Sequence, residues 1–223
     1  MFIYAIYNLF FPKICGACSK LTIKFEDELC LRCELQLLNL AEPNANKIAK
    51  ELKGRVEIEK GVYLFDFSKK ERVQEILHSI KYKKNKKLGS YIAEQMARKL
   101  GVFFFEDVDI LLPIPLHPKK EKIRGYNQAE LIAKGIYNFI PIEINLTSLK
   151  RTIFTDSQTN KNRMERWENV QNAFEVRNKK KLDNKHILLI DDVFTTGATL
   201  EACIKTLKRE VNCRYSILTI ARA

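Results

Sequence analysis

The stretch "ILLIDDVFTTGATL", residues 187–200, places two adjacent aspartates directly after a run of four apolar residues. The apolar run predicts a buried strand over 186–190. In open sheets with helices on both faces, ligands bind beyond the carboxyl ends of the strands, where Asp191 and Asp192 stand. In the segment 195–199, Gly197 lets the backbone approach a phosphate, and the helix expected after it presents its positive end. The aspartates can accept ribose hydroxyls, so the stretch predicts a sugar-phosphate site.

Segments typical of strands and of helices alternate along the rest of the chain. Such alternation predicts an α/β fold with a mostly parallel sheet flanked by helices. The polar segment 150–172 is expected to be a loop, and loops of that length are usually functional or disordered. The expected strands are 61–67, 109–118 with a tight proline-rich end, 142–146, 186–190 and 214–220, and the expected helices are 69–81, 87–100, 126–139 and 197–210.

The composition limits the size of the core and the kind of partner. A chain of 223 residues with 46% hydrophobic content is long enough for one core and a small appendage. The net charge is +12, and residues 1–48 contain five basic and five acidic side chains, so the excess lies in 49–223. That part is expected to meet an anionic partner. Charge alone does not separate nucleic acid from a small polyphosphate.

The first twelve residues, "MFIYAIYNLFFP", are apolar but lack a basic leader. They are shorter than the roughly 20 residues that a spanning helix needs. We interpret them as a short helix packed on the protein, with a signal peptide and a membrane-surface helix as alternatives. No stable membrane insertion is expected, and the expected location is the cytoplasm.

Four cysteines form two CxxC pairs separated by eleven residues: Cys15, Cys18, Cys30 and Cys33. Two such pairs can complete a tetrahedral four-sulfur zinc site. Disulfides or redox thiols are the alternative, but stable disulfides are rare in the cytoplasm and a redox motif needs only one pair. Because all four positions would be filled by protein, the zinc is expected to be structural, and to supply much of the stability of this small module.

The remaining cysteines and the histidines carry weaker predictions. Cys203 lies on the apolar face of the helix expected over 197–210, so it is interpreted as a core residue. His78 and His186 are interpreted as structural. His117 lies in the proline-rich loop 113–118 and is a candidate for the site.

The longer motifs carry a resemblance to a known family. They are "KY" at 81–82, "PIPLHP" at 113–118, "RGYNQAELIA" at 124–133 and "LKRTIFTDSQTNKNRMERWENVQNAF" at 149–174. With the cysteine pairs and the stretch at 187–200, they resemble the ComF family over nearly the whole chain. The resemblance implies a zinc ribbon in 1–48 and a type I phosphoribosyltransferase-like domain in 49–223. It also implies a link to DNA uptake in natural transformation, and to the competence machinery as a partner.

The resemblance also implies roles for individual residues. Asp191 and Asp192 would hold the ribose hydroxyls of phosphoribosyl pyrophosphate, and Arg124, whose guanidinium can grip phosphate, would join them as a catalytic residue. Magnesium would bridge the pyrophosphate and ribose oxygens. Thr155, Gln158, Arg166 and Asn169 would belong to a loop that closes over the site. The implied substrate-binding residues are Lys81, Tyr82, Pro113, Ile114, Pro115, Arg151, Val193, Phe194, Thr195, Thr196, Gly197, Ala198 and Thr199.

Two functions remain open on the sequence. The first is an enzyme that transfers a phosphoribosyl group to an acceptor, which the sequence does not identify. The second is a non-catalytic factor that binds single-stranded DNA and uses the sugar-phosphate site for regulation. In the second, Tyr82 and Tyr126 are candidate stacking platforms beside cations, with ordinary packing as the alternative. A zinc-dependent transcription factor is disfavoured because residues 1–48 carry no net positive charge.

Overall fold

The computed structural model describes residues 12–23, 25–40, 46–66, 71–154 and 173–223. Within them lies a five-stranded sheet in the order β1-β7-β6-β2-β3, in which every neighbouring pair is parallel. The predicted α/β fold is therefore confirmed. The strands are β1 (Gly61–Asp66), β2 (Ile110–Pro113), β3 (Glu143–Ile144), β6 (His186–Phe194) and β7 (Arg214–Arg222).

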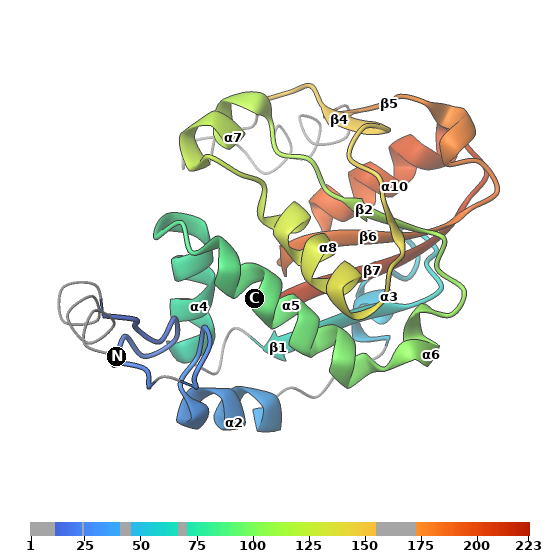
Figure 1. The fold of residues 1–223 in the computed structure, drawn as a ribbon. Helices are drawn as coiled ribbons and strands as arrows, with labels where there is room; N and C mark the ends of the chain where they lie inside the picture. The colour runs from blue at the N-terminus through green and yellow to red at the C-terminus, as the bar shows by residue number, and fades with distance from the viewer. Residues whose placement is uncertain (1–11, 24, 41–45, 67–70, 155–172) are drawn as a thin grey trace.

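Helices cover both faces of this sheet (Figure 1). One face carries α4 (Glu71–Tyr82), α5 (Lys86–Leu100) and α8 (Gln128–Phe139), and the other carries α3 (Lys47–Leu52) and α10 (Ala198–Glu210). Successive residues of β6 point to opposite faces, so Leu188 and Ile190 join one core while Ile187 and Leu189 join the other. The unbroken apolar run reflects a strand that is buried on both sides. The shorter helices are α2 (Leu31–Leu40), α6 (Val102–Phe105), α7 (Pro118–Arg124) and the 3₁₀ turn η2 (Lys179–Lys181).

The predicted helices agree with the structure to within two residues at each end. Side-chain caps explain two of the starts, because Asn85 accepts a hydrogen bond from the Leu88 N–H and Asn127 accepts one from the Ala129 N–H. The predicted strand 186–190 was too short. β6 runs on to Phe194 because β7 continues beside it, although the apolar run has ended.

The segment 150–172 also differs from the predicted loop at its margins. β4 (Leu149–Arg151) and β5 (Phe174–Val176) pair as a two-stranded antiparallel sheet at the edge of the domain. Residues 155–172, which include Thr155, Gln158, Arg166 and Asn169, lie outside the described part of the chain, so the prediction of a closing loop stays a prediction.

The cysteine module packs against the rest of the chain without a separate core. Cys15, Leu29 and Leu37 belong to the same buried cluster as Leu88 and Ile92 of α5. A Cβ atom added to Gly16 would lie 2.6 Å from Leu88 Cδ2, so glycine permits the close approach of the module to α5. The predicted division at residues 48 and 49 stays a prediction, but the two parts share apolar packing.

The amino-terminal segment 1–11, for which a packed helix was predicted, lies outside the described residues. In the part of the chain that is described, no helix combines the length and the apolar character needed to cross a bilayer.

Candidate functional site

The two aspartates lie where β6 loses one of its neighbours. β2 pairs with β6 as far as Pro113 and Ile190, and the Ile114 N–H then donates to the Ile190 carbonyl at 2.9 Å. In a continued parallel ladder, the Asp192 N–H would donate to the Ile114 carbonyl. Instead, the Asp192 N–H donates to Asp191 Oδ1 at 2.8 Å, and the Ile114 carbonyl accepts from Asn127 Nδ2 at 2.9 Å. Two side chains therefore replace the next rung of the ladder.

Each aspartate faces a basic side chain that the sequence had also singled out. Lys81 Nζ at the end of α4 lies 2.9 Å from Asp192 Oδ2, and both side chains are largely buried, at 23% and 15% exposed. Asp191 interacts electrostatically with Arg151 of β4. The structure thus brings together four predicted residues from β6, α4 and β4.

The ionisation of Asp191 is strongly perturbed. Burial and the neighbouring Asp192 carboxylate raise the pKa of Asp191 to about 7, although Lys81 and Arg151 pull it down. Burial lowers the pKa of the Arg151 guanidinium, and Asp191 opposes that shift. A carboxyl group that titrates near neutrality beside a second carboxylate is typical of a functional site.

The turn after β6 has the form expected of an anion site. Gly197 has φ +73°, a conformation that L side chains rarely adopt, and it is the N-cap of α10. Thr195 and Thr196 are exposed, and Thr199 is half-buried in the first turn of the helix. The Phe194 side chain is 1% exposed and packs under Gly197, so a contact between Phe194 and a ligand would use its main chain. The positive end of α10 begins at this turn, where the Ala198 N–H donates to Thr196 Oγ1 at 3.4 Å.

The other predicted residues have more varied positions. Pro113 and Ile114 lie beside the aspartates at the end of β2, and Pro115 begins the segment that leaves the sheet. Arg124 ends α7 and donates through Nη1 to Gln128 Oε1 at 2.9 Å. Tyr82 is 65% exposed at the end of α4.

Two further expectations concerned His117 and Tyr126. His117 caps α7 by accepting a hydrogen bond from the Lys119 N–H at 3.2 Å, which gives it a structural role in the proline-rich loop. Tyr126 is only 7% exposed, and its hydroxyl donates to the Ile80 carbonyl. The stacking role for Tyr126 was therefore wrong, and the alternative of ordinary packing is confirmed.

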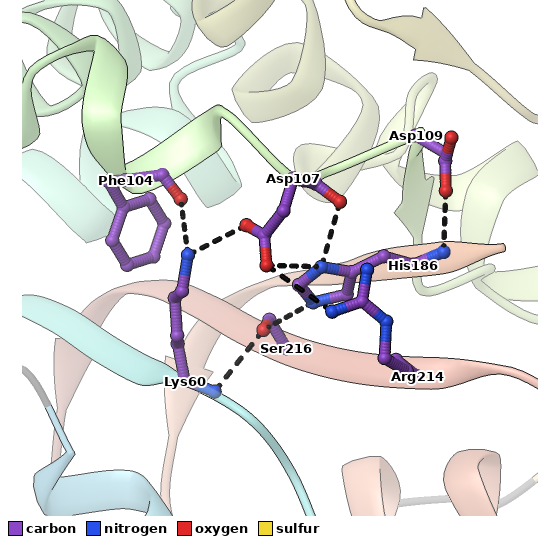
Figure 2. Close-up of polar contacts among 7 residues, drawn as sticks. All are labelled: Lys60, Phe104, Asp107, Asp109, His186, Arg214 and Ser216. Atoms are coloured by element: carbon purple, nitrogen blue, oxygen red, sulfur yellow. Dashed lines mark hydrogen bonds and ion pairs between the residues drawn. The ribbon is translucent and has the colours of Figure 1, made fainter.

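His186 lies at the opposite end of β6, in the polar cluster of Figure 2. Its ring is fully buried, with Nδ1 donating to the Asp107 carbonyl at 2.9 Å and Nε2 accepting from the Ser216 hydroxyl at 2.8 Å. Burial lowers the pKa of His186, although Asp107 opposes this shift. The ring is thus a neutral structural group, and the prediction for His186 is confirmed. Cys203 is likewise fully buried in the core, as predicted.

A groove of about 710 Å³ opens at this opposite edge of the sheet. It contains none of the residues predicted for the sugar-phosphate site. Its basic and acidic side chains nearly balance, so its charge does not select an anion. It is lined by Glu57, Lys179, Lys180, Asp183, Lys208, Arg209, Glu210, Val211, Asn212 and Cys213.

The four predicted zinc ligands converge on one point. All four Sγ atoms lie within 4.8 Å of one another, and those of Cys18 and Cys30 are 3.8 Å apart. A tetrahedral zinc with Zn–S bonds of about 2.3 Å separates its sulfurs by about 3.8 Å, so the donor set fits the metal. Burial raises the pKa of Cys15, but N–H groups from Cys30, Ala17 and Cys18 outweigh it and lower the value to about 7, which favours the thiolate.

Comparison with known proteins gives the class of this domain. The family model described as phosphoribosyl transferase domain matches residues 124–222, which run from the last residue of α7 through β7. Similar folds include a purine phosphoribosyltransferase from Pyrococcus horikoshii, at 14% identity over 59% of this chain and 80% of that one. Its TM-score of 0.36 is too low to support an argument. The parallel sheet and the matched family together define a phosphoribosyltransferase-like domain.

Three relatives, one matched over 94% of this chain and two over about half of it or less, give a narrower likeness. Competence protein F of Haemophilus influenzae is 30% identical over 116 residues, which cover 52% of this chain and 51% of the relative. DNA utilization protein YhgH of Escherichia coli K12 is 23% identical over 216 residues, covering 94% and 90%, respectively. Competence protein ComFC of Bacillus subtilis is 35% identical over 98 residues, covering 44% and 38%. The chain is thus similar to competence and DNA utilization proteins of the ComF type, and residues 124–222 form a phosphoribosyltransferase-like domain.

Some residues at this edge were not predicted from the sequence. Asn127 replaces a rung of the ladder, yet it was noted only as part of the motif "RGYNQAELIA". Arg55 lies three residues after α3, and its guanidinium donates both to Glu201 of α10 and to the Thr196 carbonyl of the turn after β6. A motif search does not find Arg55, because its partners are distant in sequence.

Proposed function

We propose that this protein binds phosphoribosyl pyrophosphate at the carboxyl edge of β6 and transfers its phosphoribosyl group to an acceptor. The supporting observation is the arrangement of Asp191 and Asp192 before the Gly197 turn, each carboxylate facing one basic side chain. The aspartates would accept the ribose hydroxyls, and the turn at 195–199 would bind the 5-phosphate. The carboxylate oxygens also suit magnesium, which prefers oxygen donors.

In the proposed reaction, the bond between the ribose C1 and the pyrophosphate oxygen breaks while a bond from C1 to the acceptor nucleophile forms. Pyrophosphate leaves with the electron pair, and the acceptor loses its proton to solvent or to the pyrophosphate. Lys81 and Arg151 are placed to balance negative charge at this edge. Magnesium, when bound with the substrate, would add positive charge at the leaving group.

Millimolar phosphoribosyl pyrophosphate with magnesium is expected to raise the melting temperature of the wild-type protein by several degrees, because a ligand that binds only the folded state stabilises it by about 2.7 kcal/mol at 100 times its Kd. Scanning calorimetry is the measurement. The Asp191→Asn, Asp192→Asn double variant should lose the shift. Asp27→Asn, whose side chain is 80% exposed on the cysteine module, is the matched control and should keep it. A wild-type protein that shows no shift would contradict the proposal.

A second candidate function, binding of single-stranded nucleic acid, is favoured by one surface. Four lysines at the junction of α4 and α5, two in the turn and two at the start of α5, are exposed near the exposed ring of Tyr82. Lys86 Nζ lies 5.2 Å from the Tyr126 ring centroid, and Tyr126 follows α7, so the end of α7 lies near this junction. Lysines beside an exposed aromatic ring suit phosphates and stacked bases. The basic residues of this surface are Lys83, Lys84, Lys86, Lys87, Lys119, Lys120, Lys122 and Arg124.

If this surface binds a single strand, affinity should fall steeply with salt, with a logarithmic slope of about −0.7 for each phosphate contact. Fluorescence anisotropy with labelled oligonucleotides at several salt concentrations measures that slope. Changing Lys83, Lys84 and Lys87 to Gln should weaken binding and flatten the slope by about 2. The same changes at Lys179, Lys180 and Lys181 control for total charge and should have a smaller effect. A flat salt dependence of the wild-type protein would rule out this function.

A further inference from the structure

We propose that Arg55 is a positioning residue for the phosphate turn at 195–199, an inference that rests on the proposed donor site. Arg55 Nη1 donates to the Thr196 carbonyl at 2.9 Å, and Nε donates to Glu201 Oε2 at 2.8 Å. Nη2 donates to the same carboxylate oxygen, which completes a fork on Glu201. One side chain thus joins the turn to the first part of α10.

The bond to Thr196 orients the peptide group that follows it. In a trans peptide, the carbonyl of one residue and the N–H of the next point in opposite directions. With the Thr196 carbonyl held toward Arg55, the Gly197 N–H is directed to the other side of the turn. An anion-binding turn needs its N–H groups, and not its carbonyls, on the ligand side. Arg55 therefore selects the peptide orientation that a phosphate requires.

The bonds to Glu201 neutralise a carboxylate near the proposed phosphate position. Glu201 lies in the first turn of α10 and is only 5% exposed. A free carboxylate there would repel a phosphate at the helix N-terminus and weaken the effect of the helix dipole. Arg55 neutralises it on one oxygen, and Lys205 Nζ contacts the other oxygen at 2.7 Å. Without Arg55, Glu201 would keep one cationic partner in place of two.

Apolar packing supports the same face of the turn. A Cβ atom at Gly197 would lie 2.9 Å from Leu52 Cδ2 and 2.9 Å from Phe194 Cζ. Leu52 ends α3 and is fully buried, and Arg55 follows three residues later. The segment 52–55 thus fills the space behind the turn. The Arg55 guanidinium holds the Thr196 carbonyl and the Glu201 carboxylate.

The test is calorimetric titration of ribose 5-phosphate into wild-type protein and variants. Arg55→Ala is expected to weaken binding about tenfold. The Glu201 carboxylate would then oppose the helix dipole, and the Thr196 carbonyl would no longer be held away from the ligand. The Arg55→Ala, Glu201→Gln double variant should recover much of that loss, because the uncompensated charge is gone. Lys208→Ala, at the other end of α10 and paired with Glu57 at 3.6 Å, is the control and should bind as wild type.

Unchanged affinity in Arg55→Ala would overturn the inference. A loss that the Glu201→Gln change does not relieve at all, together with unchanged amide exchange over 195–198, would also overturn it, because Arg55 would then act on the ligand directly. Hydrogen exchange in the ligand-free protein separates this inference from the proposed function. If no protein binds ribose 5-phosphate, the donor site fails, but faster amide exchange over 195–198 in Arg55→Ala still supports the positioning role, and unchanged exchange refutes it.

Discussion

Asp191→Asn is expected to stabilise the ligand-free protein at pH 8 while it abolishes binding of the donor. The wild-type carboxylate is buried beside Asp192, and these two causes raise its pKa to about 7. At pH 8 the charge is present and unfavourable. We expect a gain of about 1–3 kcal/mol in the free energy of unfolding, because one pKa unit corresponds to about 1.4 kcal/mol and part of the benefit is lost when Arg151 loses its partner.

The pH dependence follows from the direction of the shift. Because the pKa of Asp191 is higher in the folded than in the unfolded state, the folded protein holds more protons between about pH 4 and 7, and stability falls as pH rises through that window. The Asn variant removes this term, so its advantage should be large at pH 8 and small at pH 5. His186, whose lowered pKa makes stability fall as the pH drops below its usual range, contributes equally to both proteins and cancels.

Urea unfolding of the two proteins at pH 5 and pH 8 measures the difference. Asp192→Asn is the comparison variant, because it relieves the same repulsion but also loses the 2.9 Å ion pair with Lys81, so it should stabilise the protein less than Asp191→Asn does. If Asp191→Asn is less stable than the wild type at pH 8, the charge of Asp191 does not destabilise the ligand-free protein, and the prediction is wrong.

Removal of zinc should unfold more than the cysteine module. Cys15 and Cys33 share a buried cluster with Leu88 and Ile92, and the Tyr91 hydroxyl of α5 donates to Glu34 of α2. Structural zinc contributes folding free energy directly. We therefore expect Cys33→Ser, or a strong chelator, to lower the melting temperature of the whole chain by about 10 °C or more in one transition.

Metal analysis and calorimetry of the purified protein test this expectation. Cys213→Ser is the control, because Cys213 is half-buried outside the cluster and donates to the Leu182 carbonyl, so its loss should cost far less. A variant that keeps a second transition at the wild-type temperature would mean that the module unfolds alone. Protein purified without chelator that holds no zinc would refute the metal assignment.

The sequence predicted the parts of the fold and the site that local pattern decides. The apolar run before Asp191 predicted a buried strand, and the caps at Asn85 and Asn127 begin helices close to the predicted positions. It did not predict that β6 continues past the aspartates, because the continuation depends on pairing with β7. Ion pairs such as that between Lys81 and Asp192 join segments 111 residues apart, and no local sequence pattern predicts them.

The exposed fraction of a side chain is a second property that the sequence did not predict. Tyr82 and Tyr126 have the same residue type and similar basic neighbours, yet one ring is 65% exposed and the other 7%. The difference arises because Tyr126 is tied to the Ile80 carbonyl between packed helices. The role proposed for Arg55 could not be predicted either, because it depends on a contact with Glu201, which is 146 residues away in the sequence.

The absence of a hydrogen bond between the Asp192 N–H and the Ile114 carbonyl affects which substitutions this site can tolerate. Beyond Ile190, the two main-chain groups that would continue the ladder between β2 and β6 bond to side chains, the Asp192 N–H to Asp191 Oδ1 and the Ile114 carbonyl to Asn127 Nδ2. Substitutions in the segment 115–124, which follows Ile114, can therefore shift this segment while the hydrogen bonds between β6 and β7 stay intact. Such changes would remodel one side of the proposed site and leave the parallel sheet beneath it as it is.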